Sequence, residues 1–227
     1  MSFKKIEIKK NITISIVENI EIPKDLRVKL DKIWEEESRK NAKIFDGKVL
    51  FYLKVNNGKI ECFYSYYRYW YSQRFMGEPD QSFRFLALAV TGVITSKNLV
   101  FLGKRSQNVT QDKGLFEVFP SGGISIDSGG DFKEQLLQEF EEEVGANRSK
   151  VSSILPAFIL EDDENNVVDI VSTININCDI NQLSCSNEEY NEFLLLDLGD
   201  VVLSDTSLNL SEISRIILGD ISIWSNK

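Results

Sequence analysis

The residues best suited to chemistry are glutamates between Gly122 and Gly145. A helical projection at roughly 100° per residue places Glu139, Glu142 and Glu143 on one flank of a helix, at or beyond the edge of its apolar arc. Like charges at this spacing repel one another, and a bound divalent cation would offset the repulsion. Oxygen-rich ligands of this kind suit Mg²⁺ or Mn²⁺. From the carboxylates alone, a solvated acidic helix face is the simpler interpretation.

Histidine is absent from the 227 residues. Its absence excludes Ser-His-Asp and Cys-His nucleophiles, histidine-ligated zinc and a histidine general base. Acid–base or metal chemistry must therefore come from carboxylates, lysine, tyrosine or water. The cysteines Cys62, Cys178 and Cys185 are not spaced as a metal knuckle, and they indicate unpaired thiols in a reduced cytosolic setting. We expect a cytoplasmic protein.

A second candidate is the stretch Tyr64 to Phe75, in which seven of twelve residues are aromatic and two are arginines, Arg68 and Arg74. Such a stretch could form a stacking and cation–π surface for a flat ligand such as a nucleobase. It could equally be an aromatic core strand or a hydrophobic cover for the N-terminal segment. The arginines are harder to place in a core, so the functional interpretation depends mainly on them.

Charge and hydropathy limit the partners. The chain has 26 Lys and Arg against 35 Asp and Glu, a net charge of −9. This balance disfavours duplex nucleic acid, which requires a basic face. The first ten residues lack the apolar stretch of a signal peptide, and the longest apolar runs are far shorter than a bilayer span. We therefore expect no duplex nucleic acid and no membrane partner, while the oligomeric state stays open.

The elements that position these residues follow from periodicity and turn signals. Alternating isoleucines predict strands within residues 6–16, and helical spacing predicts helices over 25–37, 131–144 and 212–218. Asn56-Asn57-Gly58 predicts a hairpin joining strands 49–55 and 59–66. Further strands are predicted at 85–95, 99–104, 114–119, 154–160, 167–176 and 193–198, with a loop at 120–123. Hairpin-linked strands between helices favour a mixed-sheet sandwich over a doubly wound parallel sheet.

The glutamate helix and the loop before it resemble the signature of the Nudix hydrolase superfamily. Gln138 to Gly145 resembles the second half of that signature, with Gln138 in place of arginine and Phe140 in place of an aliphatic residue. Pro120-Ser121-Gly122-Gly123 resembles the proline-glycine-glycine run that opens it. The resemblance implies an α+β fold: a Nudix-type α/β/α sandwich with mixed β-sheet at 84–227, plus an N-terminal β-rich, substrate-shaping appendage at 1–83.

Two departures from the signature affect one structural element. One extra residue precedes the helix, and the family's first glutamate falls at Gly130. In the family that glutamate pairs with the motif arginine, which is Gln138 here. Because both partners of this ion pair are missing, neither is left as an unpaired charge. We therefore expect other contacts to hold the loop against the helix, and we expect the metal site to be retained.

The resemblance implies a Mg²⁺-dependent attack of water on a diphosphate linkage. It implies metal ligands at Glu139, Glu142, Glu143 and the backbone carbonyl of Gly123, and catalytic roles for Glu142, Glu143, Glu189 and Glu192. Glu189 and Glu192 are candidate general bases, with a solvated loop as the alternative. Expected substrate-binding residues are Tyr67, Arg68, Arg74 and Arg105.

A weaker resemblance concerns the N-terminal half. Trp34, the Ile44 to Val49 turn and Tyr67-Arg68 look like the leader of the UDP-glucose/UDP-galactose diphosphatase branch, and so does the run Gly114 to Pro120. This resemblance implies a UDP-sugar cleaved to UMP and sugar 1-phosphate. Two alternatives remain. One is a catalytically silent Nudix-fold binding or regulatory module; the other is a hydrolase of ADP-ribose, a dinucleotide or capped RNA.

Overall fold

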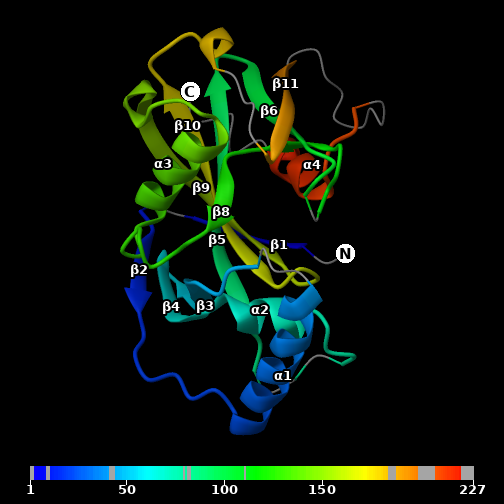
Figure 1. Cartoon of the computed structure of the whole chain (residues 1–227). Helices are drawn as coiled ribbons and strands as arrows, with labels where there is room; N and C mark the ends of the chain where they lie inside the picture. Colours follow the sequence, from blue (N-terminus) through cyan, green and yellow to red (C-terminus); the bar gives the residue numbers. More distant parts are fainter. Residues whose placement is uncertain are drawn as a thin grey trace. The chain divides into compact units, whose positions relative to one another are not determined.

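The computed structural model describes residues 3–8, 11–40, 44–78, 80, 83–109, 111–183, 188–198 and 208–220. The chain forms two compact units (Figure 1). Unit 1 comprises Met1–Ala89, Gly123–Phe132 and Ile159–Ile170, and unit 2 comprises Val90–Gly122, Lys133–Phe158 and Val171–Lys227. Each unit is therefore assembled from stretches that are distant in sequence. The boundary between residues 83 and 84 stays a prediction.

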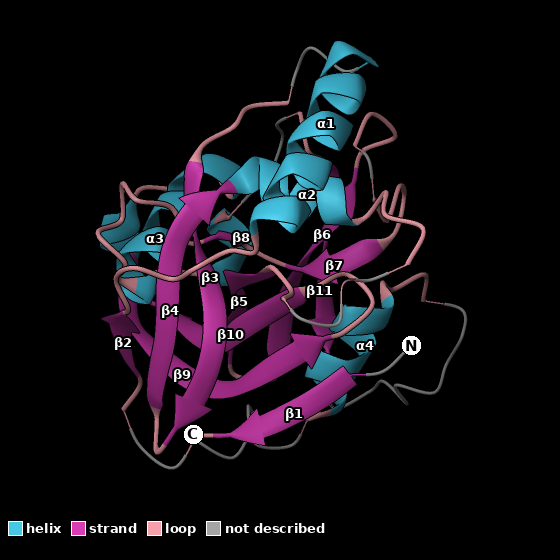
Figure 2. Cartoon of the chain, turned by 90° about the horizontal axis from the view of Figure 1, so that it is seen from below, coloured by secondary structure: helices cyan, strands magenta, loops and turns pink. Residues whose placement is uncertain are grey.

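Unit 1 contains β1 (Phe3–Glu7), β2 (Thr13–Ile16), β3 (Lys48–Asn56) and β4 (Lys59–Tyr66). Asn57 and Gly58 join β3 to β4 with φ values of 50° and 78°, the left-handed region that a tight hairpin turn requires. β3 and β4 pair antiparallel, whereas β2 pairs parallel with β4. Figure 2 shows β2, β4 and β3 running side by side. The predicted hairpin is confirmed.

Two helices, α1 (Lys24–Lys40) and α2 (Tyr67–Gln73), belong to unit 1. Trp34 of α1 meets Tyr71 of α2 edge to face, with ring centroids 5.8 Å apart. Residues of both helices form a buried cluster with residues of neighbouring segments: Leu26, Leu30, Phe51, Phe63, Tyr69 and Phe85. The predicted strand at 59–66 is confirmed as β4, and the alternative of an aromatic core strand does not extend beyond Tyr66, where α2 begins. Residues three and four apart stack on a helix, and Tyr67 contacts Trp70 and Tyr71 in this way.

Among the described residues, eleven strands are joined by hydrogen bonds, with a main path β1-β9-β10-β5-β3-β4-β2. The three long strands β5 (Leu86–Ser96), β9 (Val151–Asp162) and β10 (Val167–Ile176) each contribute residues to both units. Parallel and antiparallel pairs both occur. The predicted mixed sheet with helices is therefore confirmed.

Unit 2 adds β6 (Leu99–Arg105), β7 (Phe116–Val118) and β11 (Tyr190–Asp197). β6 lies between them, antiparallel to both. β5 and β6 form the predicted central hairpin, in which Ser96 pairs with Leu99. A short strand, β8 (Ser121–Gly123), replaces the predicted loop because it pairs with β5.

The main helices of unit 2 are α3 (Phe132–Glu143), whose first residue belongs to unit 1, and α4 (Glu212–Gly219). Short 3₁₀ turns lie at Arg148–Lys150 and Ile180–Gln182. Leu136, Phe140 and Val144 are fully or almost fully buried, as the predicted apolar arc requires. Ser211 caps α4, because its side chain accepts a hydrogen bond from Ser214 N. No helix in the described part of the chain is long and apolar enough to span a bilayer.

Candidate functional site

The glutamates of α3 lie beside β8, the short strand that precedes this helix in the sequence. Glu143 is 6% exposed and its carboxylate accepts from Ser121 N at 2.9 Å. The Glu139 carboxylate accepts from Gln135 Nε2 at 2.7 Å, whereas Glu142 is exposed to solvent. Buried and exposed carboxylates thus share one helix flank.

Gly122 is required by this arrangement. A Cβ built at Gly122 would overlap the carboxylate of Glu139. The backbone of β8 therefore lies close against the Glu139 carboxylate, which a side chain at position 122 would displace. Gly123 has open space around its Cβ direction and is exposed at the end of β8.

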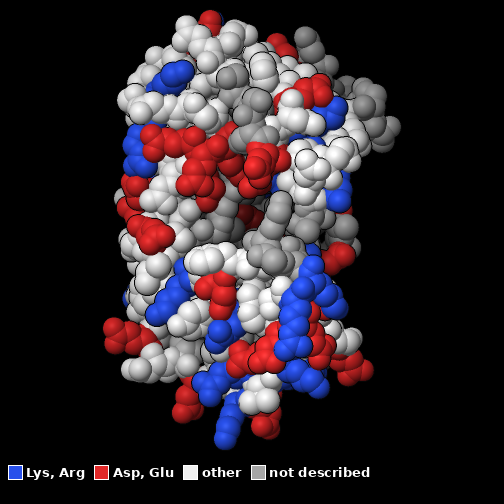
Figure 3. Space-filling view, in the orientation of Figure 1, with Lys and Arg blue, Asp and Glu red and all other residues white. Residues whose placement is uncertain are grey.

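Burial and mutual repulsion both act on these carboxylates. Burial, together with the nearby Glu142 and Glu189, raises the pKa of Glu139 to about 7. Burial also raises the pKa of Glu143 well above its usual value, and Glu139, Glu189 and Glu117 add to the rise. The Glu189 carboxylate therefore acts electrostatically on both α3 glutamates. In Figure 3, acidic side chains gather on the face that includes α3.

Arg105 contacts both Glu189 and a buried pair formed by Glu117 and Tyr190. Arg105 Nη1 donates to Glu189 Oε2 at 2.8 Å, and Arg105 Nε lies 3.5 Å from Glu117 Oε1. The Tyr190 hydroxyl donates to Glu117 Oε1 at 2.6 Å. Ser106 holds the neighbouring backbone with two hydrogen bonds. Its hydroxyl donates to the Glu188 carbonyl at 2.8 Å, and its backbone N–H donates to the Glu189 carbonyl at 2.7 Å. Glu189 is therefore fixed through both its side chain and its backbone.

Glu117 and Tyr190 were missed by sequence reasoning. Glu117 is 9% exposed, and burial raises its pKa to about 7. The sequence carried two signals: Glu117 lies between the apolar strand residues Phe116 and Val118, and Gly103 lies in an apolar strand. A Cβ at Gly103 would come within 2.6 Å of the Tyr190 ring, so this glycine makes room for the tyrosine.

The opposite flank of α3 has a different role. Arg148 bridges Glu134, at 2.9 Å, and Glu141, at 2.7 Å. These two glutamates face away from the cluster, as the helical projection predicts. Gln138, which replaces the motif arginine, lies 3.4 Å from Glu134 and donates to it. Gly130 adopts a left-handed φ of 78°.

Glu192 is separate from the buried pair. Its carboxylate is more than half exposed and binds Lys104 at 2.7 Å. Between the two candidate bases, Glu189 is the one whose charge acts on Glu139 and Glu143. The catalytic roles of both residues stay predictions.

Three predicted substrate residues lie in unit 1 rather than unit 2. Arg68 binds Asp46 at 3.0 Å and Asp31 at 3.1 Å, and its guanidinium lies over the rings of Tyr66 and Tyr69. Arg74 lies over the Trp70 ring, 5.1 Å from its centroid. Tyr67 packs on Trp70 and Tyr71.

The aromatic segment thus makes contacts within itself and also with Asp31, Asp46 and Trp34 of unit 1. The substrate roles of its residues stay predictions. Arg105, the fourth predicted residue, is engaged with Glu189, Glu117 and Tyr190 in unit 2.

The donor set of α3 fits a hard divalent cation in chemical terms, because it offers carboxylate oxygens under mutual repulsion. Within the described residues, however, no group of three or more His, Cys, Asp or Glu side chains is arranged to hold a metal ion. Metal binding would therefore require these carboxylates to come closer together than they lie in this structure.

The two cysteines that the structure describes are not part of a metal site. Cys62 is a buried free thiol, and burial raises its pKa to about 12. Cys178 is also free, and Cys185 lies outside the described residues.

Comparison with protein families and with curated proteins finds no match. Solved structures that match this chain in fold include Nudix proteins. The MutT protein of Methanosarcina mazei shares 22% identity at a TM-score of 0.47, covering 62% of this chain and 96% of that one. The NUDIX domain of Shewanella oneidensis NrtR, complexed with ADP ribose, shares 15% sequence identity at a TM-score of 0.47. The match covers 63% of this chain and 90% of that one.

The pyrophosphohydrolase BsRppH of Bacillus subtilis shares 19% identity at a TM-score of 0.44, covering 64% of this chain and 84% of that one. At such identities and scores, these similarities assign neither a family nor an activity to this chain.

Proposed function

We propose that the protein is a Nudix-type pyrophosphohydrolase that cleaves the diphosphate linkage of a nucleoside diphosphate derivative. The observation that carries this proposal is the carboxylate cluster of unit 2, which lies beside the Gly122 backbone. In it, besides burial, Glu142 and Glu189 help to raise the pKa of Glu139, and Glu139 and Glu189 help to raise that of Glu143. Buried carboxylates that repel one another destabilise the fold, and such an arrangement is typical of functional sites.

Glu139, Glu142 and Glu143 would hold Mg²⁺ or Mn²⁺, with the Gly123 carbonyl as a further ligand. When bound, the cation would polarise phosphoryl oxygens and lower the pKa of a coordinated water. Glu189 would accept the proton of the water that attacks phosphorus. Its carboxylate is held for that task by Arg105 at 2.8 Å. Glu192 is the alternative base.

For the substrate we propose a UDP-sugar, cleaved to UMP and sugar 1-phosphate. This finer assignment rests on the Ile44 to Val49 turn and on Tyr67-Arg68. Asp46 in that turn accepts from Arg68 N at 2.9 Å and from its guanidinium at 3.0 Å, so the two leader segments meet in unit 1. ADP-ribose, dinucleotides and capped RNA are the alternatives within the same reaction class.

The test is hydrolysis of a panel of UDP-sugars, ADP-ribose, dinucleotides, nucleoside triphosphates and capped RNA with Mg²⁺. We expect turnover of a diphosphate-linked substrate, and loss of about tenfold or more in Glu142→Gln. Glu134→Gln is the matched control, because Glu134 lies on the same helix but binds Arg148. Turnover unchanged in Glu142→Gln would overturn the ligand assignment.

A catalytically silent Nudix-fold binding module is the second candidate. It is favoured by the lack of a converged three-carboxylate group among the described residues and by glutamine at position 138. No turnover across the panel and no Mn²⁺ binding, measured by calorimetry, would decide for this module. Turnover of any diphosphate would decide against it.

A further inference from the structure

The proposed base Glu189 takes part in a closed cycle of contacts in unit 2. It directly precedes Tyr190, which pairs with Arg105 of β6 in the antiparallel register. Arg105 Nη1 donates to Glu189 Oε2 at 2.8 Å and to the Tyr190 hydroxyl oxygen at 3.4 Å. The Tyr190 hydroxyl donates to Glu117 Oε1 at 2.6 Å, and Arg105 Nε lies 3.5 Å from the same oxygen. The peptide bond between Glu189 and Tyr190 closes the cycle.

A β-bulge in β11 separates the two candidate bases. Tyr190 pairs with Arg105 and Glu192 pairs with Lys104, so Asn191 is an extra residue between them. Paired residues share a face of the sheet, and neighbours along a strand point to opposite faces. The bulge therefore places Tyr190 and Glu192 on opposite faces, although they are two residues apart. Glu192 accordingly binds Lys104 at 2.7 Å and lies outside the cycle.

Tyr190 is held by its aromatic ring as well as by its hydroxyl. The side chain is fully buried, and its ring packs on Phe119 with centroids 4.6 Å apart. The Arg105 guanidinium lies over the same ring, 5.3 Å from its centroid. A Cβ at Gly103 would come within 2.6 Å of this ring, so the strand leaves room for the tyrosine only because it has glycine there. Tyr190 is thus a fixed support for the residue before it.

Glu117 supplies the charge that faces Arg105. Burial by itself would lower the pKa of Arg105, but Glu117, Tyr190 and Glu189 raise it above its ordinary value, so the guanidinium stays charged. Glu117 has the largest raising effect of the three. Its own carboxylate is 9% exposed, and a buried acid of this kind is typical of functional sites.

We propose that Glu117 and Tyr190 are positioning residues, which hold Arg105 and thereby fix the Glu189 carboxylate for proton transfer. The inference rests on the proposed function, because Glu189 acts as a base only if the protein cleaves a diphosphate. A base that is displaced from its acceptor position loses rate even where the substrate and the metal still bind. Removing either positioning residue should therefore lower kcat and leave KM unchanged.

The test measures kcat and KM at pH 8 with Mg²⁺, using UDP-glucose and ADP-ribose as substrates. Tyr190→Phe removes the hydroxyl and keeps the ring, and we expect kcat to fall about tenfold while KM and Mn²⁺ affinity stay the same. In the Glu189→Gln background, Tyr190→Phe should lower kcat no further, because the carboxylate that it positions is gone. An equal loss in both backgrounds would overturn the proposal, since a general structural defect acts independently of Glu189.

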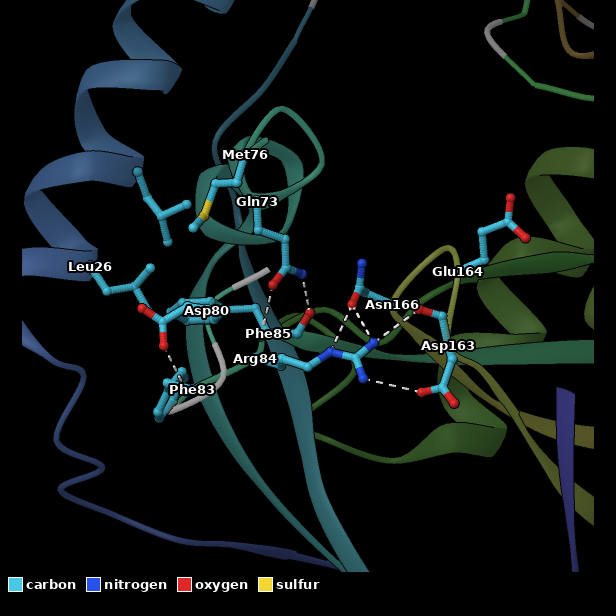
Figure 4. Close-up of a pocket in the computed structure, with 11 residues that line it drawn as sticks. Leu26, Gln73, Met76, Asp80, Phe83, Arg84, Phe85, Asp163, Glu164 and Asn166 are labelled. Atoms are coloured by element: carbon cyan, nitrogen blue, oxygen red, sulfur yellow. Dashed lines mark hydrogen bonds and ion pairs between the residues drawn. The ribbon is translucent and has the colours of Figure 1, made fainter. Parts of the chain in front are cut away.

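Two variants in unit 1 are matched controls. Tyr52→Phe also removes a bond from a buried tyrosine hydroxyl to a carboxylate, that of Glu161 at 3.1 Å. Arg84→Lys is the control for Arg105→Lys, because Arg84 also binds a carboxylate, that of Asp163 at 3.2 Å (Figure 4). Arg105→Lys should lower kcat, since lysine lacks the fork that reaches two partners, whereas both controls should keep the wild-type kcat. A control that loses as much activity as its matched variant would contradict the proposal.

Hydrogen exchange separates this inference from the proposed function. Ser106 N donates to the Glu189 carbonyl at 2.7 Å, so exchange of this amide reports how firmly Glu189 is held. Tyr190→Phe should speed it about tenfold, relative to the Leu50 amide, which donates to Ile124 O at 2.9 Å in unit 1. Faster exchange at Ser106 without turnover by the wild type would refute the proposed function and support the holding of Glu189. Unchanged exchange with unchanged kcat would overturn the positioning role.

Discussion

Replacing Glu117 with glutamine removes a buried negative charge from unit 2 and keeps an oxygen acceptor for the Tyr190 hydroxyl. Burial raises the Glu117 pKa from 4.5 to about 7, although Arg105 and Tyr190 oppose part of the rise. Between these pH values the folded state binds more protons than the unfolded state, so the free energy of unfolding falls as pH rises. The full effect is about 3 kcal/mol once the pH passes the folded-state pKa.

Urea unfolding, followed by circular dichroism with EDTA present, measures this effect. Glutamine does not titrate, so the Glu117→Gln variant should lose less stability than the wild type as pH rises. The difference in unfolding free energy, variant minus wild type, should increase by about 2–3 kcal/mol between about pH 5 and about pH 8. The loss or gain of uncharged contacts is the same at both pH values and cancels.

Two further variants test the reasoning. Tyr190→Phe removes the hydrogen bond that lowers the Glu117 pKa, so its stability should fall more steeply with pH than that of the wild type. Glu192→Gln removes one exposed charge from the neighbouring strand and controls for net charge. Parallel pH curves for wild type and Glu117→Gln would refute the conclusion that burial of this carboxylate costs stability.

Three other predictions concern packing and the cluster. Gly122→Ala should displace the Glu139 carboxylate and weaken Mn²⁺ binding, measured by calorimetry, by roughly tenfold or more; unchanged affinity would contradict the close approach. Phe85→Ala should lower the unfolding free energy by about 3–5 kcal/mol, because the side chain is fully buried in the unit 1 cluster. Arg148→Ala removes both ion pairs on the outer flank of α3, so thermal melting should begin at a lower temperature while Mn²⁺ affinity stays the same.

The features that depend on local spacing were predicted correctly from the sequence. The apolar arc of α3 is buried, and Glu134 and Glu141 lie on a different flank from Glu139. Helical periodicity depends on residues within one turn of each other, so it can be read without knowing the fold. The Asn57-Gly58 turn is equally local, because only residues tolerant of positive φ satisfy it.

Features that depend on distant partners could not be predicted in this way. The aromatic segment divides into the end of β4 and the start of α2, and its arginines are engaged by Asp31, Asp46 and Trp70. Propensity alone does not decide between strand and helix in such a segment, since tertiary packing overrides it.

The sequence by itself determined that any site must use carboxylates, because the chain lacks histidine, and that three glutamates share one flank of α3. Only the tertiary structure decided which further groups join them. Arg105, Glu117 and Tyr190 come from three different strands, and Tyr190 meets the other two through contacts that span more than 70 residues. Their burial and pKa shifts arise from this packing, because desolvation depends on what surrounds a side chain and not on its neighbours in sequence.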